Sequence, residues 1–191
     1  MKKIDRSEVL PLGEYEKIRE PFRKRIVEMK KARRIKIGDD LSLVFENHDT
    51  MLMQVQEMLR TERISNEKGI AHELETYNEL VPGDRELSAT LFIEIPELAR
   101  REEMLTRLCA IEEHVALEVG GETCRATFEE GRRDKGRAAA VQYLKFPLTD
   151  KAIGALREGK PASVVVDHAH LKTRVELPKA TTASLTDDLA D

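Results

Sequence analysis

The sequence predicts an α+β fold in which a helical N-terminal half packs on a mostly antiparallel, β-rich C-terminal half. Apolar residues recur at helical spacing before residue 83, segments rich in strand-forming residues follow it, and the connections between those segments are short. We therefore divide the chain into a helical subdomain (1–83), a β-rich subdomain (84–178) and a disordered acidic tail (179–191).

The first helix is predicted to have Pro21 in its first turn, where the missing N–H costs nothing, and to run to about Arg34. A broken helical segment is expected before it, near residues 6–10 and 14–20. The helical spacing after Pro21 comes from Phe22, Ile26, Met29 and Arg33.

A long second helix is predicted from about Asp40 to Arg63. Its 3.6-residue period comes from Leu41, Val44, Phe45, His48, Leu52, Val55 and Leu59. A strand with Leu41, Leu43 and Phe45 on one face is the competing interpretation of its beginning. A third helix begins at Ser65-Asn66 and ends at Pro82-Gly83, with inward residues Ile70, Leu74, Tyr77 and Val81.

The C-terminal half contains the predicted strands 86–95, 114–119, 123–128, 140–146 and 162–177, the last as one strand or a pair. Gly120-Gly121 predicts a hairpin turn with positive φ angles. Short helices are expected at 97–108 and, capped by Thr149, up to Arg157.

Composition excludes several classes of protein. The two cysteines, Cys109 and Cys124, lack CxxC spacing, which argues against a disulfide framework or a cysteine zinc site. The N-terminus lacks the apolar run of a signal peptide, and no stretch approaches the roughly 18 apolar residues of a membrane helix. We expect a cytoplasmic protein that does not contact the membrane.

A polar stripe along the predicted second helix is the first candidate binding surface. Its members are Asn47, Thr50, Gln54 and Glu57, and amides and hydroxyls in register need partners when they are desolvated. Either hydrogen bonds between helices or recognition of a ligand or partner explains the stripe. The full set of candidate binding residues is Glu46, Asn47, Thr50, Gln54, Glu57, Arg60, Tyr77 and Asn78.

Metal, nucleic-acid and catalytic roles have weak support. Asp167, His168 and His170 resemble part of a metal site, but no third and fourth ligand is evident nearby. Residues 23–36 hold eight basic side chains without an aromatic platform, so nucleic-acid binding is not favoured over a solvated helix or an acidic protein partner. No catalytic or cofactor motif is present, and we assign no cofactor.

Two long stretches, FENHDTMLMQVQEMLRTERI (45–64) and TYNELVPGDRELSATLFIEI (76–95), resemble an uncharacterised bacterial family, a domain of unknown function. The leading EYEKIREPFRKRI and the later YLKFPLT and VVVDHAH extend the resemblance to about Pro178. The positions that match the family's motif are Phe45, Glu46, Asn47, Thr50, Gln54, Gln56, Glu57, Arg60, Glu62, Tyr77, Asn78 and Glu79.

The resemblance implies a redox or peroxide-stress context, because genes of that family often lie beside rubrerythrin and a cysteine-rich iron–sulfur oxidoreductase. The first hypothesis is therefore a non-catalytic accessory protein that docks onto such a redox partner. The second is a small-molecule-binding domain or enzyme with a site between the helical and β halves. A homodimer would give this small, highly charged chain extra burial, and the sequence leaves that alternative open.

Overall fold

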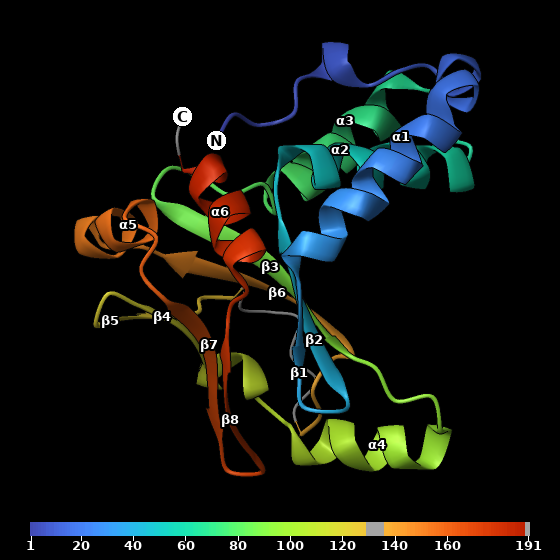
Figure 1. The fold of residues 1–191 in the computed structure, drawn as a ribbon. Helices are drawn as coiled ribbons and strands as arrows, with labels where there is room; N and C mark the ends of the chain where they lie inside the picture. The colour runs from blue at the N-terminus through green and yellow to red at the C-terminus, as the bar shows by residue number, and fades with distance from the viewer. Residues whose placement is uncertain (129–135, 190–191) are drawn as a thin grey trace.

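The computed structural model describes residues 1–128 and 136–189, and it confirms the α+β fold (Figure 1). The helices lie mainly in the N-terminal half, and the strands form two four-stranded antiparallel sheets. The first sheet has the order β1-β2-β3-β6, and the second has the order β5-β4-β7-β8. The strands of the first sheet are β1 (Arg34–Ile37), β2 (Leu41–Glu46), β3 (Glu86–Ile93) and β6 (Val141–Pro147).

The second sheet is built from two hairpins. Its strands are β4 (Val115–Val119), β5 (Glu122–Arg125), β7 (Ala162–His168) and β8 (Leu171–Glu176), so the region 162–177 forms a strand pair. Gly120 and Gly121 join β4 to β5 with φ angles of 59° and 81°, which confirms the predicted turn. A Cβ on Gly120 would lie 2.4 Å from the Cβ of Ala155, so the close packing against the next helix also requires glycine there.

The helices surround the two sheets. They are α1 (Leu12–Arg33), α2 (His48–Thr61), α3 (Glu67–Asn78), α4 (Leu98–Arg107), α5 (Asp150–Arg157) and α6 (Lys179–Asp188), with short 3-10 turns η1 (Arg6–Glu8) and η2 (Ile111–His114). Asn66 caps α3 and Thr149 caps α5 through their side-chain oxygens, as their sequence positions predict.

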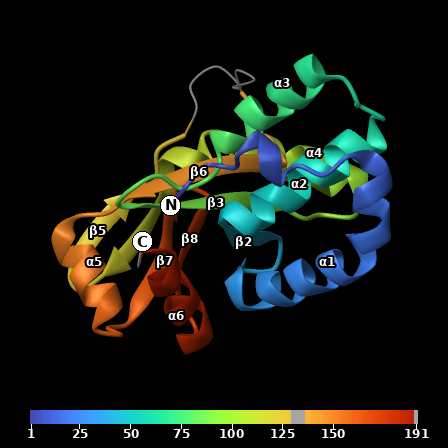
Figure 2. The ribbon, with the colours of Figure 1, turned by 90° about the horizontal axis from the view of Figure 1, so that it is seen from above.

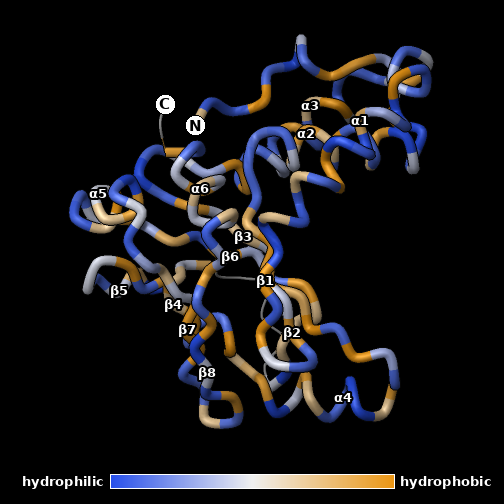
Figure 3. Tube along the Cα trace, viewed as in Figure 1, coloured by the Kyte–Doolittle hydropathy of each residue, from blue (hydrophilic) through white to orange (hydrophobic). Residues whose placement is uncertain are grey.

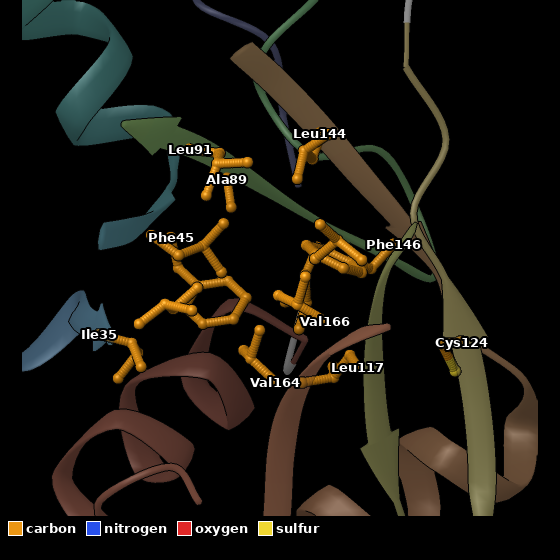
Figure 4. Packing of buried hydrophobic residues seen from close by; sticks show 14 of the residues in the cluster. Ile35, Phe45, Ala89, Leu91, Leu117, Cys124, Leu144, Phe146, Val164 and Val166 are labelled. Atoms are coloured by element: carbon orange, nitrogen blue, oxygen red, sulfur yellow. The ribbon is translucent and has the colours of Figure 1, made fainter. Parts of the chain in front are cut away.

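The main core lies between the facing sides of the two sheets. Phe45 and Phe146 are fully buried there, with ring centroids 6.1 Å apart, and aliphatic residues of β3, β4 and β7 fill the space around them (Figure 4). A second, smaller core joins the N-terminal segment to α2 and α3. Its buried residues are Ile4, Val9, Met51, Val55, Leu59, Ile70, Leu74 and Val81.

The predicted helix from Asp40 to Arg63 is wrong in its first part. Residues Leu41–Glu46 form strand β2, and α2 begins only at His48. All six residues of β2 are buried, because helices cover the face that does not contribute to the main core. A strand that is buried on both faces does not alternate apolar and polar residues. Its run of apolar residues then also fits the 3.6-residue period of a helix. Strand β2, which pairs with β1 on one side, therefore pairs with β3 on the other, across the predicted boundary at residue 83.

The first helix also differs from its prediction. Helix α1 runs without a break from Leu12 to Arg33, so Pro21 lies inside it instead of in its first turn. The lack of an N–H at Pro21 removes one bond of the helical ladder. The buried side chains of Tyr15 and Ile26 anchor the helix on either side of that position.

The expected disorder of the tail is wrong for residues 179–188, which form helix α6. Thr181, Leu185 and Leu189 are buried at spacings of four residues, and α6 lies between α5 and α1 (Figure 2). The Thr181 hydroxyl donates to the carbonyl of Ala32 at 2.6 Å. Tertiary packing of these three buried residues therefore stabilises a helix whose composition alone suggests disorder.

The guanidinium of Arg33 connects α1, β2 and α6. Its Nε donates to the Phe45 carbonyl at 2.8 Å, and Nη2 donates to the Glu46 carbonyl at 3.2 Å. Nη1 donates to Ser184 Oγ at 2.8 Å, and Nη2 also donates to the Asp188 carboxylate. The Arg33 side chain is completely buried, so these acceptors replace its lost hydration.

Hydropathy changes sign every few residues along the trace (Figure 3). Within residues 1–128 and 136–189, no helix is both long and apolar enough to cross a membrane.

Replacing Arg33 by Met is expected to lower the free energy of unfolding by about 3–5 kcal/mol, since it removes one partner of a buried ion pair and leaves three acceptors unpaired. Arg107→Met is the matched control, because Arg107 forms an exposed pair with Glu103, and its cost is expected to be below about 1 kcal/mol. Urea unfolding followed by circular dichroism measures both. Equal costs for the two variants would contradict the role given to Arg33.

Candidate functional site

The polar stripe predicted for residues 47–57 is engaged within the protein. Asn47 caps α2, and its Oδ1 accepts from the Thr50 N–H at 3.0 Å. Thr50 Oγ1 accepts in turn from the Asn47 N–H at 2.8 Å, which completes a reciprocal capping box. These two residues therefore begin the helix. Gln54 is half-buried and forms no hydrogen bond within the part of the chain that the structure describes.

Glu57 holds α2 against α1. Its carboxylate accepts from Arg19 Nε at 2.8 Å and Nη2 at 2.9 Å, and from the Tyr15 hydroxyl at 2.7 Å. The hydrogen bonds from Arg19 lower the pKa of Glu57 to about 2. One turn further along α2, Arg60 Nε donates to Glu16 Oε1 at 2.5 Å. Both contacts fix helix packing.

Glu46 ends strand β2 with a buried carboxylate. Its Oε1 accepts from the Thr90 hydroxyl at 2.9 Å. Lys30 Nζ lies 3.3 Å from Oε2 as an ion pair, although the angle does not make it a hydrogen bond. The ammonium thus balances the charge of a carboxylate that sits between α1 and the sheet.

Asn78 and Gln56 hold the N-terminal segment in place. Asn78 Oδ1 accepts from the Ile4 N–H at 2.7 Å, and its Nδ2 donates to the Ile4 carbonyl at 3.0 Å. Gln56 forms the same pair of bonds with the backbone of Leu10, at 2.6 and 3.3 Å. These side-chain amides hydrogen-bond both the N–H and the carbonyl of a backbone residue, as a neighbouring strand would.

The weak metal candidates do not converge on one point. His168 Nδ1 accepts from the backbone N–H of His170 at 3.2 Å, and Nε2 faces the Cys109 carbonyl at 3.1 Å. Both ring nitrogens are therefore engaged. Asp167 is exposed and pairs with Lys172 at 3.1 Å. Among the described residues, no three His, Cys, Asp or Glu side chains are grouped for metal binding.

The basic run of residues 23–36 is largely neutralised by acids of α1 and of other elements. Arg25 pairs with Asp49 at 3.1 Å, and Arg34 pairs with Glu94 at 2.5 Å. Lys30, Lys31, Arg33 and, at 3.9 Å, Arg23 also have acidic partners. Phosphate affinity depends on unpaired clustered charge, so this surface offers little of it to a nucleic acid.

A row of polar side chains crosses the outer face of the first sheet. Glu46 is the cross-strand partner of Ser88, Ser88 is the partner of Lys145, and an isolated bridge joins Lys145 to Thr127. Directly paired residues of an antiparallel sheet place their side chains on the same face. The polar groups of four chain segments are thereby brought into one line.

A cavity of about 410 Å³ lies over the Ser88–Lys145 part of this row. It is bounded on one side by the connection from α3 to β3 and on the other by β3 and β6. Its lining residues are Lys3, Asn78, Glu79, Leu80, Val81, Gly83, Glu86, Ser88, Thr127, Phe128, Tyr143, Leu144 and Lys145. A second cavity of about 280 Å³ shares Glu79, Leu80 and Tyr143 with it and includes Tyr77.

Glu86 organises the floor of the larger cavity. Its Oε1 accepts from the Gly83 N–H at 2.6 Å and from Lys145 Nζ at 3.0 Å. A Cβ on residue 83 would lie 3.1 Å from that oxygen, so glycine allows the connection to approach closely. One carboxylate oxygen thus holds the cavity wall and the lysine together.

The chain matches the model of the family described as "Protein of unknown function (DUF3501)" over residues 3–189. The chain belongs to the DUF3501 family. A crystal structure described as a novel protein of unknown function from Burkholderia pseudomallei K96243 is similar to it, with 35% sequence identity and a TM-score of 0.93. The alignment covers 98% of this chain and 100% of that one. No curated protein matches the chain.

Membership of DUF3501 confirms the resemblance to an uncharacterised family, whereas the genomic neighbourhood stays a prediction. Of the eight candidate binding residues, the structure brings Asn78 to the larger cavity and Tyr77 to the smaller one. Sequence reasoning missed Ser88, Lys145 and Tyr143. Polar residues at alternate positions of β3 and β6 were the signal in the sequence for these side chains. The alignment of these residues across the sheet, however, depends on strand register.

Replacing Glu57 by Gln is expected to lower the free energy of unfolding at pH 7 by about 1–2 kcal/mol, because the charged bonds from Arg19 are lost in a partly exposed site. The folded-state pKa of Glu57 is depressed, so its contribution is present above pH 4.5 and is lost as the pH falls toward about 2. Urea unfolding of both proteins from pH 7 to pH 3 checks this. A difference that stays constant over that range would contradict it.

Proposed function

We propose that this protein binds a small organic molecule in the cavity between the α3–β3 connection and strands β3 and β6. The observation that carries the proposal is Ser88. Only 2% of this residue is exposed, it lines the cavity, and its hydroxyl has no hydrogen-bond partner among the described residues. The hydroxyl oxygen is not sealed off from the cavity, so it can form a hydrogen bond with an atom of a bound molecule.

The cavity's composition also supports binding of a small molecule. Ligand sites are mostly apolar hollows of about 300–1,000 Å³ with a few convergent polar groups. Here Leu80 and Val81 provide apolar wall, while Ser88 and Lys145 provide polar atoms at the floor. Its position between the α3–β3 connection and the sheet also supports the proposal.

The geometry supports binding and not covalent catalysis by Ser88. An activated serine needs a hydrogen-bonded base. Lys145, its cross-strand neighbour, is instead paired with Glu86.

Docking of a rubrerythrin-like or iron–sulfur redox partner stays a prediction, as does a homodimer. The polar groups of Asn47, Thr50 and Glu57, which motivated a docking surface, form bonds within the protein. They leave a partner few free donors or acceptors on that stripe.

The neutral fluorophore N-phenyl-1-naphthylamine tests for an accessible apolar cavity. We expect saturable one-to-one binding by the natural protein. Ser88→Leu is expected to weaken this binding about tenfold or more, because the larger side chain occupies the floor of the cavity. Fluorescence titration gives both Kd values.

Thr173→Leu is the matched control, since it adds the same side chain on β8 in the other sheet and should leave the Kd unchanged. Thermal melting confirms that both variants fold. If Ser88→Leu does not fold, Leu80→Trp on the cavity wall replaces it. Absence of saturable binding, or an unchanged Kd in a folded cavity variant, would refute the proposed function.

A further inference from the structure

The floor of the cavity presents hydrogen-bond donors to a ligand. Within residues 1–128 and 136–189 the Ser88 hydroxyl forms no hydrogen bond, so it can donate to a ligand. Lys145 carries an ammonium group with three hydrogens, and its contact with Glu86 at 3.0 Å uses one of them. Because Ser88 and Lys145 are direct cross-strand partners, both groups rise from the same face of the sheet.

The acid nearest to these donors is already engaged. Glu86 Oε1 accepts from Lys145 and from the Gly83 N–H, and only about 20% of the Glu86 side chain is exposed. Glu79, the other lining acid, is exposed, and so is Lys3, which supplies a second positive charge to the lining. The lining thus holds two lysines and two glutamates, and the polar groups left over at its buried end are donors, which favour an acceptor such as a carboxylate.

The remaining wall is apolar. Leu80, Val81 and Phe128 line the cavity beside the donors. The volume of about 410 Å³ falls near the lower end of ordinary ligand sites, so the ligand is of metabolite size.

On this basis, and resting on the proposed function, we propose that the cavity takes a small organic anion, with a carboxylate at Ser88 and Lys145 and an apolar body against Leu80 and Val81. The carboxylate accepts from the Ser88 hydroxyl and from a second hydrogen of the Lys145 ammonium. The ligand carboxylate and the Glu86 carboxylate then both contact the Lys145 ammonium. The apolar wall removes the apolar body of the ligand from water.

Three eight-carbon molecules with different head groups test this inference. Octanoate, 1-octanol and octylammonium have the same apolar body, so they differ in head group alone. Each is titrated, below the concentration at which it forms micelles, against the protein saturated with N-phenyl-1-naphthylamine. We expect octanoate to displace the fluorophore at a concentration about tenfold lower than octanol, and octylammonium to be the weakest.

Two variants assign that preference to the floor of the cavity. Lys145→Met and Ser88→Ala are each expected to reduce the advantage of octanoate over octanol about three- to tenfold, while octanol itself changes little. Lys151→Met is the matched control, because Lys151 forms a comparable pair with Glu122 at 2.7 Å outside the cavity.

Equal displacement by octanoate and octanol, or stronger displacement by octylammonium, would overturn the anion inference. The same holds if Lys151→Met removes the preference as much as Lys145→Met does. These results leave cavity binding intact as long as the neutral fluorophore binds and Ser88→Leu weakens it. Failure of the fluorophore to bind would instead remove the proposed function and this inference together.

Discussion

The buried guanidinium of Arg33 fixes how the helical elements sit on the first sheet. It binds the carbonyls of Phe45 and Glu46 at the end of β2, and it binds Ser184 and Asp188 of α6. An arginine without water must have its donors satisfied, so these elements are held in one arrangement. The end of β2 is also where the polar row across the sheet begins, which makes the position of that row depend on the same contact.

The two faces of the first sheet have different roles. The inner face supplies Phe45, Leu91 and Phe146 to the main core (Figure 4). The outer face carries polar groups, which need partners once they are covered. Glu46 obtains them from Thr90 and Lys30, whereas the Ser88 hydroxyl obtains none within residues 1–128 and 136–189. The cavity lies over this part of the face, and we propose that a ligand is the partner of the Ser88 hydroxyl there.

The sequence was sufficient where a local rule decides the structure, and insufficient where a tertiary contact does. Asn66, Thr149 and Gly120-Gly121 mark helix starts and a turn through their own chemistry, and each was predicted. Strand β2 was mistaken for helix because burial on both faces removes its alternation, and α6 was missed because its stability comes from packing against α1 and α5. The residues of the cavity could not be grouped in advance, because Ser88 and Lys145 meet only through the register of β3 with β6. In the stripe of residues 47–57, Asn47, Thr50 and Glu57 have their partners inside the protein, whereas Gln54 forms no hydrogen bond within the described residues.

We propose that the cavity over Ser88 and Lys145 holds the carboxylate of a small apolar acid. Octanoate can be titrated into the isotopically labelled protein while the backbone amide resonances are followed. We expect saturable shifts concentrated at Gly83, Ser88, Tyr143 and Lys145, with resonances of the β7–β8 hairpin unchanged. Shifts scattered over the surface without saturation, or concentrated away from β3 and β6, would contradict it.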